Sequence, residues 1–259
     1  YEIYRSTNKN KGYKKIATIK SGKNTTYTDK KVKFGITYYY KIQTLNQSEG
    51  VTGYSGYSAV KSGKTVLTTK ITSVISKDSN TLEIKWNKIP EAYGYRVLRS
   101  TSKNGTYNEV KTIKKPGTVK YQDKKAEAGK TYYYKIEILV KSGNKILKNG
   151  VSKAASGKTI KQVSVTSVTA NGTTMLLKWK KVSGADGYEI FRSTKKKGTY
   201  EKIGTVTGAK KTKYEDKTVS NGKTYYYKVR AYHKKKKLTE TGSFSKIQKT
   251  YTLKKVVIT

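Results

Sequence analysis

The sequence predicts an all-β protein built of tandem antiparallel β-sandwiches. Three segments of the 259-residue chain align with one another at a period of 93 to 94 residues, and such a period indicates a repeated structural unit. Within each repeat, apolar residues alternate with polar ones in short runs between Gly-, Asn-, Ser- and Lys-rich turns, a pattern typical of half-buried strands. Because no stretch has helical periodicity, we expect about seven short strands per repeat, enough for two packed sheets.

Aromatic residues, aspartates and glycines recur at fixed spacings and anchor the alignment. The segments YEIYRST, YRVLRST and YEIFRST begin at Tyr1, Tyr95 and Tyr188. In each repeat a tyrosine follows the arginine of this segment by eight residues, then a Tyr-x-Asp motif precedes a turn, and a glycine precedes a tyrosine triplet. The recurring positions are Tyr13, Tyr107 and Tyr200 for the first tyrosine, Asp29, Asp123 and Asp216 for the aspartate, and Gly35, Gly129 and Gly222 for the glycine.

The strands of the second repeat can be assigned in order. The first clear strand alternates Leu82, Ile84 and Trp86 with polar neighbours, and the third repeat has the same alternation at 175, 177 and 179. A strand that begins at residue 95 follows, then a hairpin near Gly105 and a strand around residue 121. In the last long strand, residues 132, 134, 136 and 138 are apolar or aromatic. Since neighbouring residues on a strand point to opposite faces, these four face the core.

These motifs together resemble the fibronectin type III family, especially the lysine-rich repeats of surface and secreted proteins of Gram-positive bacteria. The resemblance rests on the tryptophan of the second strand, the GYRVLRST or GYEIFRST strand, the Tyr-x-Asp turn and GKTYYYK, and it extends over essentially the whole chain. It implies tandem immunoglobulin-like (fibronectin type III) antiparallel β-sandwiches. It also implies a structural core containing the tryptophans and a tyrosine that makes a corner hydrogen bond. These core positions are Trp86, Trp179, Tyr38, Tyr132 and Tyr225.

Two features of the family are missing from this sequence. The usual proline before the glycine of the corner turn is replaced by Phe34, Ala128 and Asn221, which predicts a less rigid turn with the same topology. The chain also contains no Arg-Gly-Asp tripeptide, so integrin binding through that motif is not expected.

The repeat boundaries predict the domain organisation. Residues 1–68 correspond to a partial domain without its first two strands, and residues 69–161 and 162–252 correspond to complete domains. Residues 253–259 resemble the start of a further repeat. Two interpretations remain open: the chain is a segment of a longer tandem array, or the final strand completes the first domain of a neighbouring chain by strand addition.

The chain carries 57 Lys plus Arg against 16 Asp plus Glu, for a formal net charge of +41, and only five of the basic residues are arginine. A field of this size attracts anionic polymers in a salt-dependent way. Lysine is a hydrated point charge, whereas bidentate reading of bases usually requires arginine. We therefore expect weak binding to anionic cell-wall polymers or glycans, no specific nucleic-acid partner, and no membrane insertion, since no apolar run is long enough.

No catalytic, metal-binding or cofactor-binding residue is predicted, and the chain is not expected to be an enzyme. It has no cysteine and a single histidine, His233, which excludes thiolate and multi-histidine metal sites. The repeated aspartates are interpreted as acceptors for backbone N–H groups in turns, with a calcium role as the alternative. His233 precedes a lysine run and is interpreted as a solvated loop residue.

Two lysine runs are candidate polyanion-binding sites, with solvated loops as the alternative. They are Lys234, Lys235, Lys236 and Lys237, expected between the sixth and seventh strands, and Lys195, Lys196 and Lys197. A candidate aromatic surface is expected on the outward side of the third and sixth strands, as one apolar pair per repeat: Tyr4 with Tyr39, Leu98 with Tyr133, and Phe191 with Tyr226. Such pairs either stabilise the sheet, or form a platform for a sugar ring or for another module.

The most consistent function is a non-catalytic extracellular spacer or adhesion repeat of a bacterial surface or secreted protein, held near anionic wall polymers by its charge. The alternatives are a structural subunit of an extracellular filament or surface layer, joined through strands or aromatic faces to other copies of itself, and a polysaccharide-binding accessory module. All three place the chain outside the cell, with any signal or anchor outside this sequence. Fold resemblance by itself does not decide among them.

Overall fold

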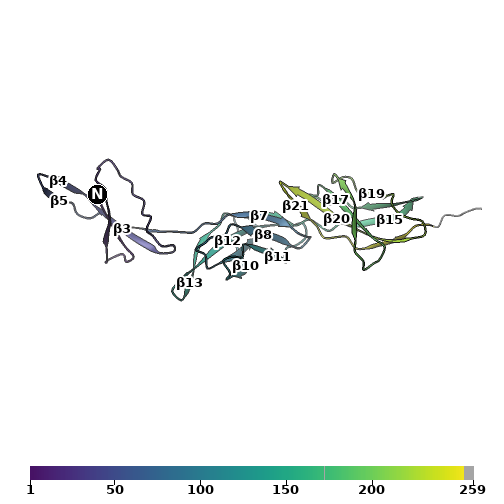
Figure 1. Ribbon diagram of the computed structural model, residues 1–259, viewed down its shortest axis with the longest axis horizontal. Helices are drawn as coiled ribbons and strands as arrows, with labels where there is room; N and C mark the ends of the chain where they lie inside the picture. The colour runs from purple at the N-terminus through teal and green to yellow at the C-terminus, as the bar shows by residue number, and fades with distance from the viewer. Residues whose placement is uncertain (172, 254–259) are drawn as a thin grey trace, which may run out of the picture.

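The computed structural model describes residues 1–171 and 173–253, and every regular element in them is a β-strand. Three modules lie end to end along the long axis of the molecule (Figure 1). We call residues 1–68, 69–161 and 162–252 the first, second and third modules. Residues 254–259, most of the predicted final strand, lie outside the described residues, so the strand-addition hypothesis stays a prediction.

The first module contains six strands: β1 (Glu2–Ser6), β2 (Lys14–Thr18), β3 (Thr37–Gln43), β4 (Leu45–Ser48), β5 (Val51–Tyr54) and β6 (Lys61–Lys64). The second contains eight: β7 (Ile71–Ser76), β8 (Leu82–Trp86), β9 (Gly94–Ser100), β10 (Asn108–Ile113), β11 (Lys120–Asp123), β12 (Thr131–Ser142), β13 (Lys145–Val151) and β14 (Ala155–Lys158). The third also contains eight: β15 (Val165–Asn171), β16 (Thr174–Trp179), β17 (Gly187–Ser193), β18 (Glu201–Thr207), β19 (Lys213–Asp216), β20 (Thr224–Lys235), β21 (Leu238–Thr241) and β22 (Gln248–Tyr251).

The second and third modules are immunoglobulin-like sandwiches, which confirms the predicted fold class. In the second, a three-stranded sheet in the order β11-β8-β7 faces a larger sheet in the order β10-β9-β12, in which both β13 and β14 pair with β12. The third repeats this plan with β15-β16-β19 and with β18-β17-β20, and its β21 and β22 pair with β20. All pairings are antiparallel. Two sheets packed this way bury one face each.

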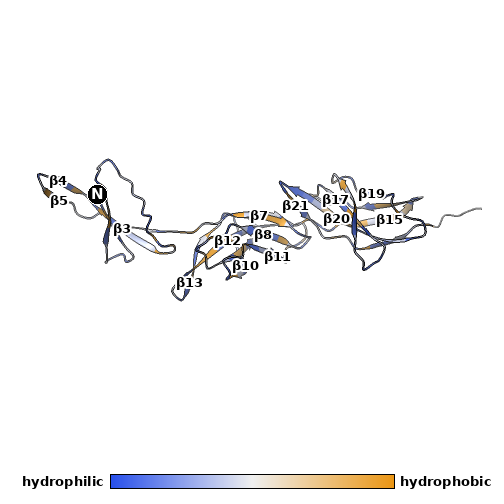
Figure 2. Cartoon of the chain, viewed as in Figure 1, coloured by the Kyte–Doolittle hydropathy of each residue, from blue (hydrophilic) through white to orange (hydrophobic). Residues whose placement is uncertain are grey.

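Each sandwich has its own core between the sheets. The core of the second module contains the almost completely buried Trp86, Tyr95 and Tyr134. The core of the third module contains Trp179 and Tyr188, which are equally buried. The tryptophan ring meets the neighbouring tyrosine ring edge-on in both, with centroids 5.5 and 5.1 Å apart. Figure 2 shows hydrophobic and hydrophilic segments interspersed along the strands, as expected when one face packs inward and the other meets solvent.

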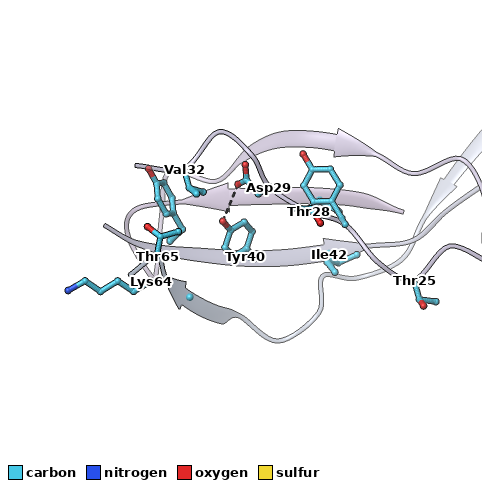
Figure 3. A pocket seen from close by; sticks show the side chains of 12 residues that line it. Thr25, Thr28, Asp29, Val32, Tyr40, Ile42, Lys64 and Thr65 are labelled. Carbon is cyan, nitrogen blue, oxygen red and sulfur yellow. Dashed lines mark hydrogen bonds between the residues drawn. The ribbon is translucent and has the colours of Figure 1, made fainter. Parts of the chain in front are cut away.

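The first module forms the larger sheet alone, in the order β2-β1-β3-β6, beside the small β4-β5 ribbon. No strand of residues 1–68 covers the inner face of this sheet. Ile42 is therefore 41% exposed, whereas its equivalents Ile136 and Val229 are fully buried. A hollow of about 580 Å³ lies here, bordered by Val32, Tyr40 and Ile42 among others (Figure 3).

The corner tyrosines lie at the turn before the long strand. The hydroxyl of Tyr132 accepts a hydrogen bond from the backbone N–H of Glu127 at 3.1 Å, and Tyr38 and Tyr225 make the same bond five residues upstream. The glycine of this turn has φ near +78° at Gly129, a conformation in which side chains with a Cβ are strained. This left-handed glycine shapes the turn although the preceding proline of the family is absent.

The connections between modules are short, and each contains a buried apolar residue. Leu67 and Ile160 are each 6% exposed, so apolar linker side chains belong to the junctions. Hairpins of the following module also reach back: Asn149, on β13, accepts a hydrogen bond from the Leu67 N–H, and β21 contacts β7 (Figure 1). The modules are therefore joined by packed junctions rather than by free linkers.

Candidate functional surface on the larger sheets

The outward side of the larger sheet has the same layout in every module. We call it the outer face. Three rows of side chains cross it from one end to the other: a charged row, a lysine and aromatic row, and a tyrosine row. The charged row contains Glu2, Arg96 and Glu189; the second row contains Lys41, Lys135 and Lys228; and the tyrosine row contains Tyr39, Tyr133 and Tyr226.

The charged row neutralises itself. In the second module the Arg96 guanidinium binds the carboxylates of Glu109, at 2.6 Å, and Glu137. In the third module the signs are exchanged, and Glu189 accepts from Lys202 at 3.0 Å and from Arg230 at 2.8 Å. The row therefore holds the sheet together without adding to the outward positive charge.

The same row in the first module is centred on a carboxylate as well. Hydrogen bonds from Lys15, Tyr4 and Gln43, in that order of strength, lower the pKa of Glu2 to about 2. This carboxylate is therefore ionised at any neutral or mildly acidic pH.

The second row places a lysine ammonium over aromatic rings. Lys41 Nζ lies 3.5 Å from the ring centroid of Tyr57 and 4.8 Å from that of Tyr13. Lys228 Nζ lies 3.7 Å from the Tyr200 centroid and 5.5 Å from that of Phe244. In the second module Lys135 Nζ lies 4.1 Å from the Tyr107 centroid. Contacts of this kind hold the cation by attraction to the ring face.

The rings are themselves held in place. The hydroxyls of Tyr13 and Tyr107 each donate to a backbone carbonyl four residues upstream at 2.8 Å, and Tyr200 does so at 3.1 Å. Burial, followed by the nearby Tyr133, raises the pKa of Tyr107, and Tyr226 acts in the same way on Tyr200. Tyr133 and Tyr226 lie two residues before the lysines of the second row on the same strand, so the tyrosine row borders the second row.

The residues of each predicted apolar pair are diagonal neighbours on the outer face and do not directly face each other. Tyr4 lies opposite Lys41 in the register, and Tyr39 lies opposite Ser6; the other two modules have the same arrangement. A two-residue offset along the strand makes Tyr4 and Tyr39 diagonal rather than facing. The ring that Tyr4 meets is Tyr57, with centroids 5.2 Å apart, and Phe191 meets Phe244 at 4.9 Å.

The repeated aspartates accept backbone hydrogen bonds at turns, and each also joins a buried network. One oxygen of Asp216 accepts from the Thr218 N–H at 2.9 Å, and the other accepts from Arg192 at 2.8 Å and Tyr227 at 2.7 Å. Asp29 and Asp123 make the equivalent contacts in the other modules. The arginine of the YRST-like segment is therefore a structural partner of the aspartate.

The buried network lowers the pKa of the Asp216 carboxyl and raises the pKa of the tyrosine hydroxyls. Burial acts to raise the pKa of Asp216, but hydrogen bonds from Tyr227, Thr218 and Arg192 outweigh it, and the pKa is lowered. Burial, and then the bond to the aspartate, raises the pKa of Tyr134 and Tyr227, and raises that of Tyr40 to about 12. A carboxylate committed to this many donors is not placed to act as a general base.

The two lysine runs lie far apart. Lys195, Lys196 and Lys197 are exposed in the turn after β17, next to the start of β20, whereas Lys234 lies near the other end of β20. A strand rises about 3.3 Å per residue, so roughly 30 Å separates the two groups. The structure does not bring them together into one site.

The expected loop at the second run is largely a hairpin. His233, Lys234 and Lys235 belong to β20 and pair with β21, which leaves Lys236 and Lys237 in the turn. The loop prediction is wrong for His233, Lys234 and Lys235, because strand pairing continues as far as Lys235, and it holds for the two turn residues. All four lysines are exposed, and Lys235 donates to the Val74 carbonyl of the second module at 3.3 Å, at the junction.

His233 also belongs to this hairpin. Its Nδ1 lies 3.0 Å from a carboxylate oxygen of Asp186, and its side chain is 38% exposed. Among residues 1–171 and 173–253, no three His, Cys, Asp or Glu side chains gather closely enough to hold a metal ion. The same residues include no helix that could span a membrane.

The sequence reasoning did not single out the second row. Lys41, Lys135 and Lys228 each follow a tyrosine triplet, and Tyr57 and Phe244 occupy one equivalent position after the hairpin. The repeat shows that these positions are equivalent. It does not show that the lysines contact the rings, because Tyr57 and Phe244 reach the outer face only where the chain returns beyond the hairpin.

No family model matches this chain. The chain is similar over part of its length to two curated bacterial enzymes: 56 residues are 46% identical to an amylopullulanase of Thermoanaerobacterium saccharolyticum, covering 21% of this chain and 4% of that protein. In the second match, 64 residues are 39% identical to an amylopullulanase of Thermoanaerobacterium thermosulfurigenes, covering 25% of this chain and 3% of that protein. The chain thus matches only a small part of the length of these relatives.

Solved structures with a similar chain path are tandem fibronectin type III domains. The chicken CNTN1 FN1-FN3 domains are 15% identical, cover 98% of this chain and 91% of their own, and have a TM-score of 0.46. A two-domain segment of chicken tenascin is 19% identical, covers 70% of this chain and 97% of its own, and has a TM-score of 0.34.

Proposed function

We propose that the chain is a non-catalytic spacer and adhesion segment of an exported bacterial protein, kept near the cell wall by attraction to anionic wall polymers. The observation that carries the proposal is the unequal use of the charges. All five arginines are in ion pairs within their own modules, but only six lysines of the described residues are. The net charge of +41 is therefore presented almost entirely as solvated ammonium groups.

The acidic side chains do not offset this field at the surface. All but four lie within 4.0 Å of a basic side chain of the described residues, and the four exceptions are Glu49, Asp78, Glu91 and Glu201. Carboxylates that are already paired are poor partners for further cations and poor candidates for acid–base chemistry. Diffuse attraction of a polyanion is the interaction that such a surface supports best.

The packed junctions support the spacer part of the proposal. Two reciprocal hydrogen bonds join Ser79 and Ser243. The Ser79 N–H donates to the Ser243 hydroxyl at 3.0 Å, and the Ser243 N–H donates to the Ser79 hydroxyl at 2.9 Å. Thr241 also donates to the Lys77 carbonyl at 2.9 Å. A series of modules fixed in this way spans distance better than modules on flexible linkers, whose ends stay closer together.

The test is binding of the chain to purified wall preparations over a range of salt concentrations. Counterion release predicts that the logarithm of the affinity falls linearly with the logarithm of the salt concentration. Walls stripped of their anionic polymers serve as the control and should lose most of the binding. Affinity that is equal at low and high salt would contradict retention by charge.

A second candidate function is a polysaccharide-binding accessory module. The two amylopullulanase matches favour it, because the name of these relatives refers to the polysaccharide pullulan. Under this alternative, the chain would bind a neutral glucan such as pullulan independently of salt. Affinity gel electrophoresis with and without pullulan separates the two functions, since a neutral polymer would not retard a chain that binds only through charge.

A further inference from the structure

The lysines of the second row differ from all the other lysines of the described residues. Lys41, Lys135 and Lys228 are half-buried, whereas every other described lysine is exposed. Their ammonium groups lie over aromatic rings at 3.5 to 4.8 Å and make none of the ion pairs found in the described residues. Each module therefore holds one oriented cation that lacks an acidic partner.

Orientation matters because an exposed lysine loses side-chain freedom when it binds. Fixing a long side chain costs roughly 0.5 to 1.5 kcal/mol per residue on binding. A stem already packed on a sheet, with its ammonium over a locked tyrosine ring, has lost much of that freedom during folding. At equal charge, such a lysine binds an anion more tightly than a mobile one.

The neighbouring groups indicate which anion fits. Bidentate recognition of carboxylates is typical of arginine. The outer-face arginines, Arg96 and Arg230, already bind Glu109, Glu137 and Glu189. What stays free is a single-point ammonium donor beside an aromatic ring, which suits one phosphate oxygen together with the C–H surface of a polyol or sugar.

We propose that the second row is a repeated binding site for a polyol-phosphate polymer, with one phosphate held by Lys41, one by Lys135 and one by Lys228. This proposal rests on the proposed function, whose polyanion it specifies, and charge complementarity selects the occupant. Sites on one chain reinforce one another because each bound phosphate raises the local concentration of the next.

The sites are not equal. Lys41 and Lys228 each lie near two rings, and Lys135 lies near one, since Val151 occupies the position of Tyr57 and Phe244 in the other modules. Single substitutions at Lys41 or Lys228 should therefore weaken binding more than the same change at Lys135.

The experiment uses the full chain and poly(glycerol phosphate) as the probe. A triple variant, Lys41→Met, Lys135→Met and Lys228→Met, keeps an apolar stem on the rings and removes the ammonium. The matched control replaces three exposed lysines that contact no ring and occupy one equivalent position per module: Lys30→Met, Lys124→Met and Lys217→Met. Both variants lose the same formal charge, and Lys217 is the one control lysine with an ion pair in the described residues, at 3.9 Å from Glu215.

The site variant should lose about tenfold or more in affinity, and the control about twofold. The salt slope should fall by about two in the site variant, since flexible polyanions contribute about 0.7 per released contact. If the Met variant does not fold, a triple Lys→Arg variant replaces it. That variant keeps the cation over the ring and should bind within about threefold of the original chain, whereas a larger loss would overturn the proposal.

Two further results would overturn the proposal. Equal losses in site and control variants would show that position does not matter and that charge alone binds the polymer. The second result is that the original chain binds polyglutamate as tightly as poly(glycerol phosphate) and that the site variant loses this binding. It would show that the site accepts carboxylates. If the original chain fails to bind any polyanion at low salt, the proposed function fails as well. These outcomes are distinguishable because only the last one concerns the unsubstituted chain.

Discussion

Removal of the Asp216 carboxylate is expected to destabilise the third module more than any surface change. The side chain is 1% exposed and accepts hydrogen bonds from Arg192 at 2.8 Å, Tyr227 at 2.7 Å and Thr218 at 2.9 Å. Asp216→Ala leaves the fully buried hydroxyl of Tyr227 without an acceptor. Breaking a buried pair from one side usually costs about 3 to 5 kcal/mol.

The lower end of that range applies here. The Arg192 side chain is 21% exposed and keeps a bond to the Thr218 carbonyl at 3.2 Å, so water and the backbone recover part of the loss. We expect about 3 kcal/mol for Asp216→Ala. The adjacent Glu215 is 38% exposed and points away from the core, so Glu215→Ala should change stability by less than about 0.5 kcal/mol.

The assay is urea unfolding followed by tryptophan fluorescence. In a Trp86→Phe background, Trp179 is the single tryptophan and reports the third module alone. A double-mutant cycle with Tyr227→Phe should give a coupling of about 1 kcal/mol, because without the hydroxyl no donor is stranded. A loss below about 1 kcal/mol for Asp216→Ala, or no coupling, would refute the reasoning.

Three further predictions concern the acid range and the two junctions. Because the pKa of Asp216 is lowered on folding, the ionised carboxylate stabilises the fold above its unfolded pKa of about 3.9, and this stabilisation is lost as the pH falls through the folded pKa. Asp216→Asn should therefore flatten the acid-induced drop in melting temperature below about pH 4. A plot of melting temperature against pH that does not change in this variant would count against the prediction. At the first junction, a Cβ on Gly150 would collide with the Leu67 carbonyl, whereas the equivalent Gly56 faces open space. Gly150→Ala should therefore lower the free energy of unfolding by about 1 to 3 kcal/mol in thermal unfolding. A similar loss for the control Gly56→Ala would show that the collision is not the cause. At the second junction, the double variant Ser79→Ala and Ser243→Ala removes both reciprocal hydrogen bonds. The distribution of distances between spin labels in the two flanking modules should then become broader. Distributions of equal width would mean that packing alone sets the angle between the modules.

Much of the fold could be read from the sequence because it depends on local periodicity. The alternation around Trp86 and Tyr134, the left-handed glycine of each corner and the turn aspartates are set by neighbours within a few residues. Repetition strengthened each assignment, since an alternation found at one position could be checked at its equivalents.

The contacts of the candidate surface depend on tertiary structure instead. Which residue lies opposite Tyr4 depends on strand register, and a shift of two residues replaces Tyr39 with Lys41. Whether Lys228 is a solvated charge or an oriented one depends on Tyr200 and Phe244, which are distant in sequence and meet only after the sheet forms. The sequence by itself determined the strands, the turns, the repeat and the excess charge, because these follow from local spacing and composition. Only the tertiary structure decided which side chains face one another and which ammonium groups are held in place, because long-range packing sets both.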